Sequence, residues 1–127
     1  MRFVPALAPL ALLLALAPAR AQIAAAPDPA QHYTDLVTCY VAYEQDKSQA
    51  AARGDRAREA RRGAQIPPVL TQIGAAGQAI GKDQAGIEAD LKRAMDAGFA
   101  GLAAGTVTPA DLDASVAACE AWLGAPP

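Results

Sequence analysis

The feature that most constrains the fold of this chain is its pair of cysteines, Cys39 and Cys119, the only two in 127 residues. They lie near opposite ends of a stretch in which apolar residues recur at helical spacing. Cysteines of exported proteins are commonly joined in disulfides, whereas those of cytosolic proteins are kept reduced. Whether the chain is exported therefore decides whether two distant segments are covalently joined.

The N-terminus has the three parts of a secretory signal peptide, predicted over residues 1–21. Arg2 gives a positive start, residues 4–17 are almost entirely Val, Ala, Leu and Pro, and Ala-Arg-Ala at 19–21 offers the small-x-small pattern of a cleavage site. The alternative, a membrane anchor, takes about 20 apolar residues, and this proline-containing run is shorter. We therefore expect cleavage before Gln22 and general secretory export to a bacterial periplasm or beyond.

The mature chain is expected to be one small domain. Loss of the leader removes two arginines and leaves nine basic against thirteen acidic residues, a formal net charge of −4. A mildly acidic chain is a poor candidate for nucleic-acid binding. Residues 22–29, rich in Ala and Pro, predict a flexible N-terminus, and residues 30–124 predict a single helical domain with no further membrane-spanning segment.

Four amphipathic segments indicate an all-α fold. The first begins near Ala30, the second follows Pro67-Pro68, where proline suits a first helical turn, and the third covers about 83–104. The fourth has Thr108 as N-cap, Pro109 at the first helical position and Gly124 at its end. The sequence thus predicts a small bundle of four, or at most five, helices.

Both cysteines fall on the apolar faces of their helices. A bond between Cys39 and Cys119 would make the first and last helices neighbours and close a separation of 80 residues, worth about 4 kcal/mol in the loop-entropy model. Two buried free thiols, or an intermolecular bond, are the alternatives. A redox-active pair is disfavoured because Cys-x-x-Cys spacing is absent.

Residues 44–65 contain no large apolar side chain, and charged residues dominate. They predict either a solvated extension of the first helix or a mobile connector, with Gly54 and Gly63 as breaks. Within ten residues, five arginines exceed two carboxylates by three charges, and arginine suits bidentate contact with phosphate or carboxylate. These residues are a candidate site for an envelope protein, an anionic lipid or lipopolysaccharide; the alternative is a solvated helix with internal ion pairs. The five are Arg53, Arg56, Arg58, Arg61 and Arg62.

The first helix is the most aromatic segment, with Tyr33, Tyr40 and Tyr43 on its apolar face. Such a stripe indicates core packing first. An aromatic platform for a ligand is the alternative.

The sequence contains few residues that could act in catalysis. His32 is the sole histidine, so a nucleophile–histidine–carboxylate triad would have to combine it with Ser48 or Ser115. With both cysteines oxidised, ligands for zinc are too few, and haem-attachment and nucleotide motifs are absent. The carboxylates of the third and fourth segments are interpreted as solvated charges. We expect no cofactor, no metal and no enzyme; a hydrolase based on His32 is the remote alternative. Those carboxylates are Glu88, Asp90, Asp96, Asp111 and Asp113.

In general plan the chain resembles periplasmic acid-stress chaperones. The similarity rests on size, two cysteines and the Thr-Val-Thr-Pro stretch at 106–109 before the second cysteine. The long arginine-rich insertion and the wide cysteine spacing depart from that plan. The sequence therefore predicts a non-enzymatic binding or structural component of the periplasm or envelope, with an acid-stress chaperone as the alternative that the resemblance implies.

Overall fold

The computed structural model describes residues 28–124, and this part of the chain forms four helices joined by short turns. They are α1 (Pro29–Arg53), α2 (Arg56–Ala79), α3 (Gln84–Ala104) and α4 (Pro109–Leu123). No strand occurs among these residues, so the predicted all-α class and the count of four helices are confirmed. The predicted signal peptide and the stretch 22–27 lie outside the described residues.

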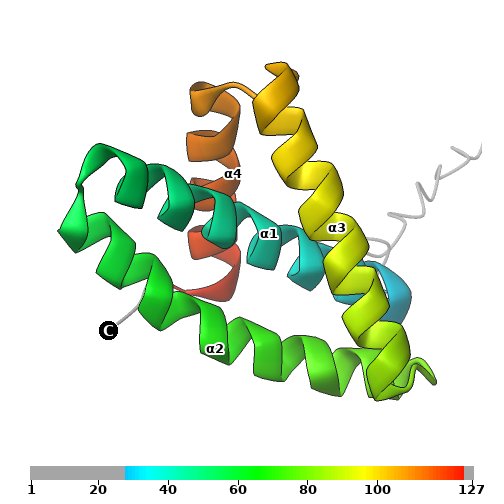
Figure 1. Ribbon diagram of the computed structural model, residues 1–127. Helices are drawn as coiled ribbons and strands as arrows, with labels where there is room; N and C mark the ends of the chain where they lie inside the picture. Colours follow the sequence, from blue (N-terminus) through cyan, green and yellow to red (C-terminus); the bar gives the residue numbers. More distant parts are fainter. Residues whose placement is uncertain (1–27, 125–127) are drawn as a thin grey trace, which may run out of the picture.

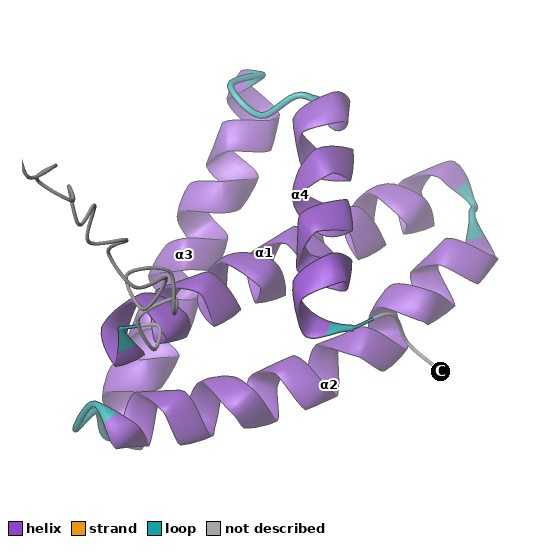
Figure 2. Cartoon of the chain, turned by 180° about the vertical axis from the view of Figure 1, so that it is seen from behind, coloured by secondary structure: helices purple, strands orange, loops and turns teal. Residues whose placement is uncertain are grey.

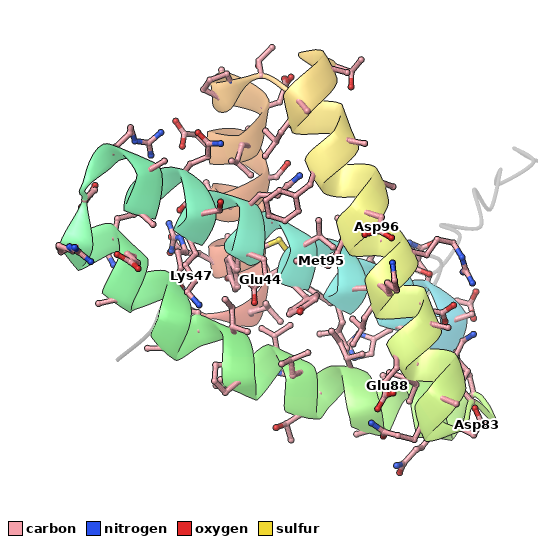
Figure 3. All side chains as sticks on the ribbon, viewed as in Figure 1. Glu44, Lys47, Asp83, Glu88, Met95 and Asp96 are labelled. Carbon is pink, nitrogen blue, oxygen red and sulfur yellow. A yellow bond between two sulfur atoms is a disulfide. The ribbon has the colours of Figure 1, made fainter. Side chains whose placement is uncertain are left out.

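Each helix begins at a side chain that caps its free backbone amides. The predicted cap of α4 is confirmed: the Thr108 hydroxyl accepts a hydrogen bond from the Asp111 amide, and the Asp111 carboxylate accepts one from the Thr108 amide. The other three caps are aspartates, whose short carboxylate side chains accept hydrogen bonds from the first backbone amides. At the far ends, Gly54 and Gly105 take left-handed backbone angles that terminate α1 and α3. The three capping aspartates are Asp28, Asp55 and Asp83, the last labelled at the start of α3 in Figure 3.

Helix α1 is the centre of the fold and contacts all three other helices. It runs between α3 on one side and α4 on the other, while α2 turns back beneath it after Gly54 (Figures 1 and 2). Helices α3 and α4 are joined by a short turn and straddle α1, packing on it rather than on each other. The residues of α1 are therefore shared between three interfaces.

The core follows from this arrangement. The apolar face predicted for the first helix is buried, except that Tyr40 remains half-buried. Leu36 and Tyr43 of α1 and Ile73 of α2 are enclosed almost completely. Ile87 is the one fully buried residue that α3 contributes, so α3 covers the core less deeply than α2 does.

Cys39 and Cys119 form a disulfide between α1 and α4, as predicted (Figure 3). Their Cα atoms are 5.5 Å apart across a sequence separation of 80 residues. Both residues are buried in the same apolar cluster. The last helix is thereby covalently fixed to the central one.

The boundary predicted at Pro67-Pro68 is wrong, because α2 begins eleven residues earlier, at Arg56, and continues through both prolines. An interior proline removes a helical hydrogen bond and costs about 3 kcal/mol. Burial of Ile66 and Val69 and the contacts of Arg62 on either side of this point favour continuation. The question left open for residues 44–65 is also settled: they form the end of α1 and the start of α2, with a break at Gly54 but none at Gly63.

Candidate functional site

The five arginines proposed as a binding site are divided by the fold into two groups. Arg53, Arg56 and Arg61 are exposed, and Arg56 pairs with Glu59 one turn along α2 at 3.5 Å. Arg58 and Arg62 instead turn inward toward α1 and α4. The segment therefore does not present five free guanidinium groups to one ligand.

Asp46 of α1 is the point on which the inward arginines converge. Its carboxylate is 1% exposed and accepts hydrogen bonds from Nε of Arg62 at 2.6 Å and from Nε of Arg58 at 2.8 Å. The guanidinium of Arg62 also lies 5.6 Å from the ring centre of Tyr43. A buried carboxylate is tolerated when it is paired and fully hydrogen-bonded, as here.

The same arginines reach the last helix. Arg62 donates to Glu120 of α4 and to Gln65 of its own helix, and Arg58 donates to Asp113 of α4 at 2.7 Å. Gln65 donates in turn to Glu120. We call this set the arginine network. It joins α1, α2 and α4 beside the disulfide, and its members are Asp46, Arg58, Arg62, Gln65, Asp113 and Glu120.

Burial disfavours ionisation of Asp46, but hydrogen bonds and charge from Arg58 and Arg62 outweigh it and lower the pKa of the carboxyl. The pKa of Glu120 is lowered in the same way, by hydrogen bonds from Arg62 and Gln65 that overcome its burial. Hydrogen bonds to Asp46 and Asp113 raise the pKa of Arg58. Each of these three shifts favours the charged, paired form of Asp46, Glu120 or Arg58.

The positive excess read from the sequence disappears in three dimensions. Within the segment, five arginines face two carboxylates, Asp55 and Glu59. Asp46, Asp113 and Glu120 add three more from α1 and α4, so the assembled region is formally neutral. A high local arginine count is therefore not a net positive surface here.

Sequence reasoning missed Asp46, although a signal was present. The apolar face of α1 steps through Leu36, Cys39 and Tyr43, and the next position at helical spacing is Asp46, followed by buried Ala50. A carboxylate at a core position calls for a cationic partner. The identity of that partner, 16 residues away in Arg62, depends on how α2 turns back.

A second feature is an open groove of about 510 Å³ between the first half of α1, the end of α2 and the middle of α3. Its walls are mostly small and apolar, with Val37 on α1 and Ala94 and Ala97 on α3. Ligand sites in proteins typically have volumes of about 300–1,000 Å³. We call it the α1–α3 groove. Its other lining residues are Ala30, Tyr33, Thr34, Thr38, Ile80, Lys82, Asp90 and Arg93.

One end of the groove is charged, and Asp90 contacts the other three polar residues there. The carboxylate accepts a hydrogen bond from the Tyr33 hydroxyl at 3.0 Å and pairs with Lys82 at 2.9 Å and Arg93 at 3.0 Å. Hydrogen bonds from Lys82, Tyr33 and Arg93 lower the pKa of Asp90 despite some desolvation. Burial and the bond to Asp90 raise the pKa of Tyr33 to about 12. Asp90 is thus not the freely solvated charge that the sequence suggested.

The remaining sequence candidates are dispersed. The His32 ring lies edge-on to Trp122, with centroids 5.5 Å apart, and no hydrogen bond within residues 28–124 joins it to Ser48 or Ser115. Over the same residues, no group of three or more His, Cys, Asp or Glu side chains is placed to hold a metal ion. None of the four helices is long and apolar enough to cross a membrane.

Comparison with known proteins adds no relative: no family model, curated protein or solved structure matches the chain.

Proposed function

We propose that this chain is a non-enzymatic binding protein exported to the bacterial periplasm or envelope. The observation that carries the binding role is the α1–α3 groove, an apolar hollow of about 510 Å³ with a cationic end. The export role is supported by the leader pattern of residues 1–21 and by the disulfide, a bond that is typical of oxidising compartments.

Export is tested by expressing the full chain in a bacterium and measuring the mass and first residue of the product in each cell fraction. The expected product begins at Gln22, lies in the periplasmic fraction and is lighter than its reduced form by two hydrogens. A chain that keeps its leader and carries free thiols in the cytoplasm would contradict the proposal.

The exposed arginines are a candidate contact with an envelope partner. The substitution set Arg53→Ser, Arg56→Ser and Arg61→Ser removes the outward charges and keeps every hydrogen-bonding member of the arginine network. We expect it to abolish co-purification of an envelope protein, or binding to anionic lipid vesicles, without changing the unfolding midpoint. Lys92→Ser is the control, because Lys92 is an exposed cation of α3 that pairs within its own helix. Unchanged co-purification and vesicle binding would exclude this contact.

An acid-stress chaperone is the second candidate, and the arginine network is the observation that favours it. The pKa values of Asp46 and Glu120 are lowered in the folded state, so their stabilisation is present above the ordinary carboxyl pKa and is lost as pH falls through the folded pKa. Acid therefore weakens the ties of α1 to α2 and α4, and those helices cover the apolar core.

The chaperone role requires suppression of client aggregation between about pH 2 and pH 4, where carboxylates become protonated. Asp46→Asn removes the titrating charge and is expected to shift the onset of suppression toward neutral pH. Absence of any suppression across this range, measured by light scattering of an acid-unfolded client, would exclude the role.

A further inference from the structure

We propose that the α1–α3 groove binds a single-chain amphiphile with one negative charge, such as a fatty acid, with its carboxylate at Lys82 and Arg93. The inference rests on the binding role proposed above and specifies its ligand class.

The groove has the polarity that such a ligand needs. Along most of its length the walls are Val37, Ala94 and Ala97, with the methyl-bearing Thr34 and Thr38 of α1. These short side chains leave room for a chain of methylene groups, each worth about 0.8 kcal/mol when removed from water. The apolar walls therefore supply affinity for a hydrocarbon tail.

The charged end determines the sign of the head group. Two cations, Lys82 and Arg93, share the single carboxylate of Asp90, so the charged residues that line this end sum to +1. Tyr33 keeps its proton, because its pKa is raised to about 12, and adds no negative charge near neutral pH. One monoanion would neutralise this end of the groove.

The two cations are also accessible to a ligand. The Arg93 side chain is 74% exposed and that of Lys82 is 35% exposed, whereas Arg62 of the arginine network is 5% exposed. Surface ion pairs are worth about 0–1 kcal/mol, so the exposed Arg93 can turn from Asp90 to a bound carboxylate at small cost. Lys82 stays paired with Asp90, 5.4 Å from the centre of the Tyr33 ring, and its ammonium has further N–H donors for the ligand.

The groove is lined by the first half of α1 and by α3, two helices that cross in Figure 1, and it shares no lining residue with the arginine network. The helices that line the groove approach other helices closely at glycines: a Cβ on Gly98 would stand 2.6 Å from Val41, and one on Gly77 would stand 2.6 Å from Ile87. Helix spacing here depends on the absence of those side chains. The groove is therefore a property of the folded bundle.

The experiment is isothermal titration of the mature chain, residues 22–127, with dodecanoate below its micellar concentration. Dodecyltrimethylammonium and dodecanol carry the same tail and test the charge. We expect saturable binding of dodecanoate at one site, with the neutral alcohol about tenfold weaker and the cation weaker still. Equal affinity for the anion and the cation, or no saturable binding to a chain with the native circular dichroism spectrum, would overturn the proposal.

Variants locate the site. Lys82→Gln with Arg93→Gln is expected to weaken the binding of dodecanoate about tenfold. Asp90→Asn is expected to strengthen it about threefold, because the charge of the lining residues rises to +2.

Two tryptophan variants test the apolar walls. Ala97→Trp fills the groove, whereas Ala100→Trp places the same bulk on an exposed position of α3 outside it. Loss of binding in Ala97→Trp with retention in Ala100→Trp supports the site; identical binding in the two overturns it.

Two other occupants of the groove, the chain's own N-terminal segment and a second copy of the chain, can be detected by titration and by sedimentation. If dodecanoate binds only after deletion of residues 22–27, the groove receives the chain's own N-terminal segment. If sedimentation shows a dimer that Ala97→Trp disperses, it receives a second copy. Either result overturns the amphiphile, whereas failure of export leaves the titration unaffected and overturns only the proposed location.

Discussion

The two ends of α1 use charge in opposite ways. At its C-terminal half, Asp46 binds two inward-turned arginines, and every charge of the network has a partner on another helix or the same one. Beside its N-terminal half, the single carboxylate of Asp90 on α3 is shared by the exposed Arg93 and the half-buried Lys82 at one end of an open apolar groove. At the arginine-rich end the charges balance and the inward arginines are held by partners, whereas the charged residues that line the groove have an excess of one positive charge. The number of charged residues in a segment is therefore a poorer guide to binding than the net charge of the residues that the fold brings together.

Removal of Asp46 or of Asp90 is expected to give the largest difference in unfolding free energy between the two ends of α1. Asp46→Ala leaves Arg58 and Arg62 without their main partner, and breaking a buried pair costs about 3–5 kcal/mol. Asp90→Ala leaves solvated cations, so the expected loss is about 1 kcal/mol. Urea unfolding monitored by circular dichroism measures both, with Asp96→Ala as an exposed control on α3. Equal losses for Asp46 and Asp90 would remove the distinction between the two ends.

The disulfide fixes α4, the helix that carries Asp113 and Glu120 of the arginine network, to α1, and its loss should affect α4 selectively. Replacing Cys39 and Cys119 by serine is expected to cost about 4 kcal/mol of unfolding free energy, since an 80-residue cross-link no longer restrains the unfolded chain. Native-state hydrogen exchange of the variant should show α4 losing protection before α3. Simultaneous loss in both helices would indicate that the groove and the arginine network are not separable.

Two glycines test how closely α3 must approach α1. Gly98→Ala places a Cβ 2.6 Å from Val41 and 2.9 Å from Gln45, so we expect a loss of about 1–3 kcal/mol despite the better helix propensity of alanine. Gly74→Ala meets no atom within 4 Å and should gain up to about 1 kcal/mol. Thermal unfolding of the pair measures the difference. A stabilising Gly98→Ala would mean that the helices can separate without cost.

The smallest expected effect concerns Tyr33. Its pKa is raised to about 12 by burial and by Asp90, so the stability it contributes is present below its ordinary pKa near 10 and is lost as pH rises toward 12. Asp90→Asn should lower this pKa, seen as an earlier rise in tyrosinate absorbance near 295 nm in a difference titration. An unchanged titration would show that Asp90 does not act on the Tyr33 hydroxyl.

Much of the fold could be predicted because it depends on local pattern. The apolar stripe of α1, the Thr108 cap and the placement of both cysteines on buried faces all follow from spacing within one helix. Pro67 and Pro68 indicate a helix start in the sequence, because proline suits a first turn. In the folded bundle they lie inside α2, where burial of residues on both sides offsets the cost of an interior proline.

The site was harder to predict, because it depends on pairs far apart in sequence. Asp90 and Asp113 look like any solvated helical carboxylates until Tyr33 and Arg58, 57 and 55 residues away, are placed beside them. The groove left no sequence signal of its own, since alanine, threonine and valine on a helix face are compatible with core or surface. Such features are determined by how helices cross.

The proposed binding surface is the α1–α3 groove, and the arginine network is proposed to be structural. ¹H–¹⁵N chemical-shift mapping of the labelled mature chain, as dodecanoate is added, tests both at once. We expect saturable shifts at the groove residues Tyr33, Thr34, Ala94 and Ala97, with those of Arg58, Arg62 and Glu120 unmoved. Shifts confined to the arginine segment, with a silent groove, would contradict it.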